Sequence, residues 1–457
     1  MGTDRWDGFF EHFLHAFSGI GCAVDAVNRV LNVTSYCVRS FDNDALLISV
    51  PLLITRPLLS EIALPPAGAD GAVSCLIEHI KEQASREPAL SPLVGYGTGF
   101  PHHYDAITEP YTLIHSDDAL AAHLWHPDTR NFCDEAGVHL VVRGAVPNPV
   151  GMSDTDMIRV TELVTRLCET IADVVQKFPI QRLETAWRTS LDQKLLRERL
   201  PLLGLVSFVG NGSRLARSCS RYREYFRVAG PKSGVNIPFT CPQELHPVEL
   251  ELAASNEIIT GLGIRAREVF AVAGSNAQGK TTFLEGIIAG MDDHAAGDGR
   301  EHVVTVRGVR SAEAMNCGLS GADISMFFSA LPPGVSGSVT SAHGRGSGSM
   351  TMAMQAGDAV RSHAPLLIID EDRAAPNLLV RSCLQTDEVT PLSEILVHDR
   401  GKMGNTALVF AACAMDTLIA EADRIMRLDR HVAYAIDRAA FRHMLAGSLR
   451  KTADSLL

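Results

Sequence analysis

Residues 274–281 have the residue types and the spacing of a phosphate-binding loop. The pattern G-x-x-x-x-G-K-S/T is met by Gly274, Ser275, Asn276, Ala277, Gln278, Gly279, Lys280 and Thr281. Its glycines let successive backbone N–H groups turn toward phosphate oxygens, and the dipole of a following helix adds positive potential. We expect Lys280 to reach the β and γ phosphates of ATP and the Thr281 hydroxyl to bind Mg²⁺. The alternative is a glycine turn beside a surface lysine.

An apolar run that ends in two acids supplies the second half of such a site. Leu366–Ile369 is followed by Asp370 and Glu371, an arrangement called Walker B. We expect Asp370 to hold Mg²⁺, directly or through water, and Glu371 to polarise the attacking water. Two carboxylates favour hydrolysis over nucleotide holding, so we predict an ATPase with Glu371 and Lys280 as catalytic residues. Taken alone, such acids often only face solvent.

Short apolar segments alternate with helical segments around these motifs. Strands are predicted at Val269–Ala273, Val303–Val306, Leu366–Ile369, Ala407–Ala411 and Ile425–Leu428, and a helix at Thr281–Met291. Strands that are apolar throughout are typical of a mostly parallel sheet covered on both faces. The predicted fold class is therefore α/β, with a P-loop nucleotide-binding core.

The N-terminal half combines strand and helix patterns. A buried strand is predicted at Ala45–Ile54, and helices at Ser153–Phe178, with Asp154 or Asp156 as its cap, and at Gln181–Leu200. A chain of 457 residues is long enough for two or three domains. We predict an α+β domain at 1–110, an accessory domain with helices and a basic segment at 111–240, and the ATPase core at 241–457.

Composition excludes several protein classes. The ten cysteines are scattered without a C-x-x-C pair, which argues against a zinc site or a disulfide framework and favours a reducing compartment. The longest apolar runs are too short and too interrupted to span a bilayer, so no membrane partner is expected. The N-terminus has the pattern of neither a signal peptide nor an Arg-rich transit peptide. A net charge of −12 argues against general coating of nucleic acid.

One segment departs from this acidic balance. Residues 181–232 contain eleven Lys/Arg and four acids, a net charge of +7, so the remainder carries −19. Aromatic residues interleave with its arginines, a mixture suited to phosphate pairing and base stacking on single-stranded RNA. The candidate RNA contacts are Arg214, Arg217, Arg221, Arg223 and Arg227, of which the first three would share a face if the segment were helical. A solvated basic face and a dimer contact are the alternatives.

A third motif lies before the Walker B strand. Ser347, Gly348 and Ser349 open a predicted helix, and this resembles the signature motif of ABC-type ATPases, although a flexible Gly/Ser-rich loop is the alternative. Further stretches are similar to a group called predicted ATPases of the ABC class, among them 200–213, 260–264, 297–301, 321–325 and 369–377. The resemblance covers roughly 200–429, and it is strongest to a kinetoplastid mitochondrial member associated with guide-RNA-directed mRNA editing.

The resemblance has consequences for the site and its partners. It implies that residues 276–282, Thr282 included, contact the phosphates and Mg²⁺, and that Ser347, Gly348 and Ser349 cap the nucleotide of a second subunit. Residues 374–377 would form a dimer contact called the D-loop. A homodimer follows, because two such ATP sites need two subunits. The resemblance also implies the mitochondrial matrix and possible other RNA-editing proteins as partners.

The chain departs from ABC transporters at one catalytic position. Transporters have a histidine at the end of the strand after Walker B, whereas this segment, 409–416, has none. We therefore expect slow turnover. The first functional hypothesis is an ABC-class ATPase that binds RNA and assists mitochondrial mRNA editing. The alternatives are an ATP-dependent ATPase that binds or remodels proteins, with no RNA role, and a transporter subunit, which the fused accessory domains disfavour.

Overall fold

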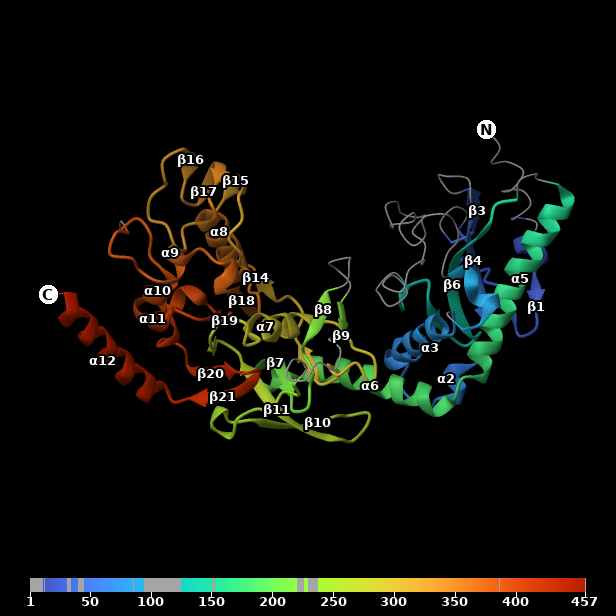
Figure 1. The fold of residues 1–457 in the computed structure, drawn as a ribbon, viewed down its shortest axis with the longest axis horizontal. Coiled ribbons are helices and arrows are strands. Elements are labelled where there is room, and N and C mark those ends of the chain that lie inside the picture. The colour runs from blue at the N-terminus through green and yellow to red at the C-terminus, as the bar shows by residue number, and fades with distance from the viewer. Residues whose placement is uncertain are drawn as a thin grey trace. The chain divides into compact units, whose positions relative to one another are not determined.

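The computed structural model divides the chain into two compact units (Figure 1). It describes residues 11, 13–30, 34–39, 45–84, 86–93, 125–149, 153–219, 226–228, 237–385 and 387–456. Unit 1 comprises Met1–Asp192 and Ser218–Arg227, and unit 2 comprises Gln193–Arg217 and Val228–Leu457. The sequence predicted three domains instead. The boundary predicted at residue 110 falls between two strands that pair in one sheet of unit 1, β4 and β6.

Unit 1 is built on an antiparallel sheet. Its strands are β1 (Ser18–Gly19), β2 (Cys22–Val24), β3 (Tyr36–Arg39), β4 (Ala45–Ile54), β5 (Phe132–Cys133) and β6 (Val138–Pro147). The order is β1-β2-β4-β6-β5, with β3 also paired to β4. β4 matches the predicted strand. It pairs with β6 along its whole length, from Ala45 opposite Pro147 to Ile54 opposite Val138.

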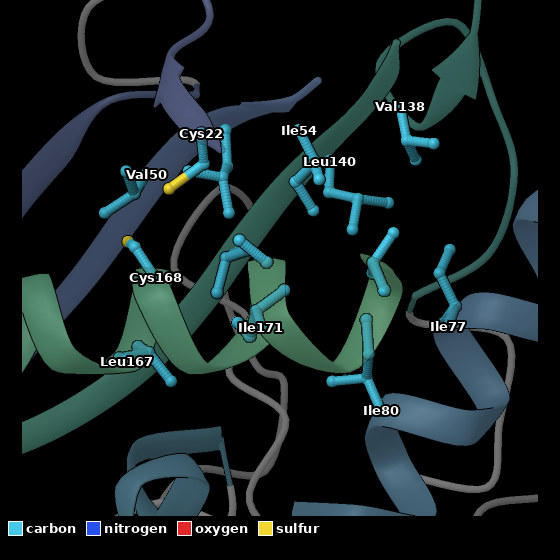
Figure 2. Close-up of a cluster of buried hydrophobic side chains, with 14 of the residues drawn as sticks. Cys22, Val50, Ile54, Ile77, Ile80, Val138, Leu140, Leu167, Cys168 and Ile171 are labelled. Atoms are coloured by element: carbon cyan, nitrogen blue, oxygen red, sulfur yellow. The ribbon is translucent and has the colours of Figure 1, made fainter. Parts of the chain in front are cut away.

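Helices pack their apolar stripes on this sheet. They are α2 (Leu58–Glu61), α3 (Ala69–Ala84), α5 (Asp154–Lys177) and α6 (Ile180–Arg199), the last of which continues into unit 2. Figure 2 shows Cys168 of α5 pointing toward Cys22 and Val50 of the sheet, and all three are buried. The N-cap of α5 is Ser153, and the predicted Asp156 completes a capping box with it, whereas Asp154 is the first residue of the helix.

The parallel sheet of unit 2 has the order β14-β18-β19-β12-β20-β21. Its strands are β12 (Val269–Ala273), β14 (Arg310–Ser311), β18 (Leu366–Asp370), β19 (Ala407–Ala412), β20 (Arg424–Asp429) and β21 (Val432–Ile436). All neighbours are parallel except β20 and β21. Both faces are buried: Val269 and Ala271 belong to one apolar cluster, and Phe270 and Val272 to another. The predicted α/β class is confirmed.

Two antiparallel sheets complete unit 2. One contains β7 (Leu205–Gly210), β10 (Val248–Glu251), β11 (Ile258–Arg265) and β13 (Val303–Thr305); the other contains β15 (Cys317–Ala322), β16 (Val335–Ser338) and β17 (Ser341–Gly346). The predicted strand at Val303 therefore exists, but it pairs with β7 outside the parallel sheet. The helices are α7 (Lys280–Ala289), α8 (Gly348–Arg361), α9 (Pro376–Leu379), α10 (Leu392–His398), α11 (Asp416–Ile419) and α12 (Arg438–Leu456). Of the helices described, none has the length and apolar character that crossing a bilayer requires.

A buried histidine links β6 to two loops of unit 1. Nδ1 of His139 lies 2.7 Å from Oδ2 of Asp25, and Nε2 lies 2.9 Å from Oδ1 of Asp134. Burial alone would lower the pKa of His139, but its hydrogen bonds to the two carboxylates raise the pKa above the ordinary 6.5. Burial alone would raise the pKa values of Asp25 and Asp134. Their hydrogen bonds, including those to His139, lower both pKa values below the ordinary 3.8. The three groups therefore stabilise unit 1 as charged partners.

Replacing this histidine is predicted to destabilise unit 1 in a pH-dependent way. His139→Gln leaves Asp25 buried without its partner, so we expect a loss of about 3 kcal/mol near pH 5–6. The two carboxylates contribute stability above their ordinary pKa, and this stability is lost as the pH falls through their lowered pKa values. His139 contributes stability below its ordinary pKa, and this stability is lost as the pH rises through its raised pKa. The difference in the free energy of unfolding between His139→Gln and the native protein should therefore be largest near pH 5–6 and smaller at lower and higher pH.

Tryptophan fluorescence during urea unfolding measures this effect. All three tryptophans, Trp6, Trp125 and Trp187, belong to unit 1. The exposed His126 provides a matched control, His126→Gln, which should leave the unfolding midpoint unchanged. A His139→Gln penalty that stays constant from pH 4 to pH 9 would show that the charges are not responsible.

Candidate nucleotide site

The loop at 274–279 joins β12 to α7 and is shaped by its two glycines. Gly274 has a φ of 142° and Gly279, the N-cap of α7, has a φ of 97°. A Cβ atom on Gly274 would lie 2.4 Å from the carbonyl oxygen of Leu428 in β20. The loop therefore lies directly against the neighbouring strand, and glycine is required at its first position.

Lys280 holds the two ends of this loop together. Its side chain is buried, and Nζ donates to the carbonyl oxygens of Gly274 at 2.8 Å and Ser275 at 3.0 Å. The ammonium group of Lys280 therefore lies beside this loop, at the N-terminus of α7. A buried cation, a helix N-terminus and glycine-rich backbone together favour an anionic ligand.

The two sequence motifs meet at one hydrogen bond. Oγ1 of Thr281, in the first turn of α7, donates to Oδ2 of Asp370 at 2.7 Å. β12 and β18 both run parallel to β19, which lies between them, so both strands end at the same edge of the sheet. A hydroxyl and a buried carboxylate in contact are oxygen donors of the kind Mg²⁺ prefers. Thr281 and Asp370 therefore fit a Mg²⁺ site.

The side-chain carboxylate of Glu371 is held by backbone N–H groups. Its Oε2 accepts hydrogen bonds from the backbone N–H groups of Cys413 and Ala414, the second at 3.3 Å. These residues follow β19, where the sequence comparison with transporters found no histidine. The carboxylate is therefore held at the same sheet edge as Asp370. No sequence pattern predicts this contact, because it joins residues 42 positions apart.

A charged group beside Asp370 was not predicted from the sequence. Arg373 lies 3.5 Å from the carboxylate of Glu285 and 3.2 Å from that of Glu313. Burial raises the pKa of Glu285, although the charge of Arg373 acts in the opposite direction. Glu285 follows Thr281 by four residues on α7, so helical spacing could have shown that both face the same side.

The predicted signature segment opens a helix, as expected. Ser347 is the exposed N-cap of α8, and the preceding Gly/Ser-rich stretch forms β16 and β17 rather than a flexible loop. Oγ of Ser349 donates to Oδ1 of Asn377 at 2.7 Å, which joins this segment to residues 374–377. In the described part of the chain, no hydrogen bond joins Ser347, Gly348 or Ser349 to the loop at 274–279.

The described part of the basic segment forms strands, so its arginines do not share the face of a helix. Arg217 begins strand β8 (Arg217–Cys219), which pairs with β9 (Phe226–Val228), the strand that contains Arg227. Phenylalanine and valine in β9 favour strand over helix. Arg214 is exposed just before β8. Arg221 and Arg223 lie outside the described residues.

The chain matches a protein-family model and a sequence relative. A family model for ABC ATPases, described as a P-loop domain, matches residues 179–454. An uncharacterized protein of Methanocaldococcus jannaschii, MJ1628, is 36% identical over 416 residues, which cover 91% of this chain and 90% of the relative.

Two solved structures resemble the chain at 14% identity each. A metal-chelate type ABC transporter in an inward-facing conformation matches 42% of this chain and 82% of its own, with a TM-score of 0.27. A bacterial Atm1-family ABC exporter with ATP bound matches 65% of this chain and 53% of its own, with a TM-score of 0.30.

The close approach of the loop to β20 yields a prediction. Gly274→Ala forces the loop away from Leu428, so nucleotide affinity should fall more than about tenfold, or 1.4 kcal/mol. Gly297→Ala is the matched control: Gly297 also has a positive φ, of 86°, but its added Cβ meets nothing within 4 Å. The control should cost about 1 kcal/mol of stability and leave affinity unchanged. Titration with a fluorescent ATP analogue and Mg²⁺ measures both variants, and equal affinities would contradict the proposed role of the contact.

Proposed function

The chain belongs to the ABC ATPase family, and from this premise we propose that it binds ATP with Mg²⁺ and hydrolyses it. The contact between Thr281 and Asp370 carries the proposal, since it unites the phosphate-binding loop with the acidic strand end. The backbone of 274–279, Lys280 and Thr282 would bind the phosphates. Thr281 and Asp370 would hold Mg²⁺, which would supply positive charge to the phosphates when bound. Glu371 would orient and polarise the attacking water.

A second copy of the chain would complete each site. Ser347, Gly348 and Ser349 make their hydrogen bonds away from the loop at 274–279. This is the expected arrangement if they cap the nucleotide of a partner subunit. The exposed N-terminus of α8 would then supply positive potential to that nucleotide. We therefore propose a homodimer with two composite ATP sites.

Loss of the Glu371 carboxylate is the first test of hydrolysis. Glu371→Gln keeps an oxygen that can accept from Cys413 and Ala414 but removes the base, so turnover should fall at least about 100-fold while ATP still binds. Lys280→Ala should lose binding itself. Glu249→Gln, an exposed residue of β10, is the control. Phosphate release in the steady state measures all three; activity retained in Glu371→Gln would refute the role of this residue.

A finer proposal concerns the accessory function. We infer that the basic hairpin β8–β9 binds single-stranded RNA with weak selectivity, and that the protein assists mRNA editing in the mitochondrial matrix. Support comes from the resemblance and from the pairing of β8 with β9, the strands that contain Arg217 and Arg227. Protein remodelling without RNA is the competing function. Adding RNA to the ATPase assay would reveal whether the two activities are coupled.

Charge reversal separates RNA binding from protein binding. Arg214→Glu with Arg217→Glu should lower affinity for single-stranded RNA at least about tenfold at low salt and reduce the salt dependence, because phosphate contacts are lost. Arg265→Glu, an exposed arginine of β11, is the matched control. Fluorescence anisotropy with a labelled oligonucleotide gives the affinities. If both variants bind RNA like the native protein, the RNA proposal fails and protein partners take its place.

A further inference from the structure

Among the described residues, the contacts that anchor the C-terminal helix α12 to unit 2 lie near its beginning. Nε of Arg442 donates to the carbonyl oxygen of Ala420 at 2.7 Å, and its guanidinium pairs with Glu421 at 2.6 Å. Arg438 also donates to Ala420. Phe441 packs against the apolar cluster of the parallel sheet. These contacts fix the direction of the helix within unit 2.

Beyond Phe441 the helix exposes apolar side chains. No residue of α12 is buried, and the exposed fractions of Met444, Leu449 and Leu456 are 63%, 53% and 81%. Figure 1 shows the helix leading away from β21 to the C-terminus. Phe441, Met444, Leu445, Leu449 and Leu456 recur at helical spacing, and we call them the apolar stripe. A solvated helix of this length is marginally stable by itself, so such a stripe indicates a partner.

The stripe begins beside the phosphate-binding loop. A cavity of about 400 Å³ is lined by Gly274, Ser275 and Gln278 of that loop and by Phe441 and Met444 of α12. If the proposed function is correct, a second copy covers this loop with its signature segment. That copy would then approach the face from which α12 projects.

Charge favours the same partner. α12 contains four Arg/Lys and one Asp, a net charge of +3, in a chain whose net charge is −12. A second copy is therefore acidic overall, opposite in sign to this helix. RNA would satisfy the charges but not the exposed leucines and methionine, whereas a second protein chain satisfies both.

We propose that residues 444–456 of α12 pack against a second copy of the chain, next to the composite ATP site. This inference rests on the proposed homodimer and goes beyond it, because it assigns an additional surface to the interface. The apolar stripe supplies buried area, and Arg450 and Lys451 pair with acidic groups of the partner subunit.

The test measures ATP-dependent dimerisation by sedimentation velocity. Glu371→Gln, which should retain bound ATP, is the parent protein, and Leu449→Glu with Leu456→Glu, at exposed positions of the stripe away from the phosphate-binding loop, is introduced into it. We expect the dimer to weaken at least tenfold, while the fluorescent ATP analogue still binds the monomer. Ala446→Glu with Ala453→Glu adds the same charge at exposed positions of α12 outside the stripe, and should change dimerisation less than twofold.

The outcomes distinguish this inference from the proposed function. If the parent dimerises with ATP and the stripe variant dimerises equally well, the inference is overturned and the composite site stands. If the parent stays monomeric with ATP, the composite site fails together with the inference. Loss of binding to RNA or to vesicles of phosphatidylserine and phosphatidylcholine in the stripe variant, with dimerisation intact, would also overturn it.

Discussion

The hydrogen bond between Thr281 and Asp370 depends on the parallel order of three strands. β12 and β18 flank β19, so the loop after β12 and the acids after β18 emerge at one edge of the sheet. This order is stable because alternate residues of each strand are buried in opposite apolar clusters. Lys280, Thr281, Asp370 and Glu371 can therefore act on one ligand although they lie in separate segments. The proposed chemistry requires this geometry.

Local patterns in the sequence predict the parts of the site that are local in the fold. The loop at 274–281 and the strand ending at Asp370 are contiguous motifs, and their strands and helix are where the apolar pattern indicates. Contacts of Glu371 with Cys413, and of Arg373 with Glu313, join distant segments through sheet topology. A single sequence contains no spacing that reports such contacts. The antiparallel pairing of β13 with β7 was missed for the same reason.

The basic segment shows where a local pattern misleads. Spacings of three and four residues between arginines would suit a helix face, but β8 and β9 pair as strands, and β9 contains an aromatic and a β-branched residue. In unit 1, by contrast, the long apolar periodicity and the proline at 179 predict α5 and α6 within a few residues. Length explains the difference, since a longer periodic segment leaves fewer alternative conformations consistent with it.

The central claim is that each of two chains completes the ATP site of the other. Mixing two inactive variants tests this claim most directly. Lys280→Ala destroys the phosphate-binding loop, and Gly348→Asp destroys the signature segment, so each variant alone should be inactive. In a mixed dimer one composite site is intact, and since half of the dimers are mixed, about a quarter of native ATPase activity should return. Absence of any recovery, with mixed dimers demonstrated by differential tags, would contradict the claim that one chain completes the site of another.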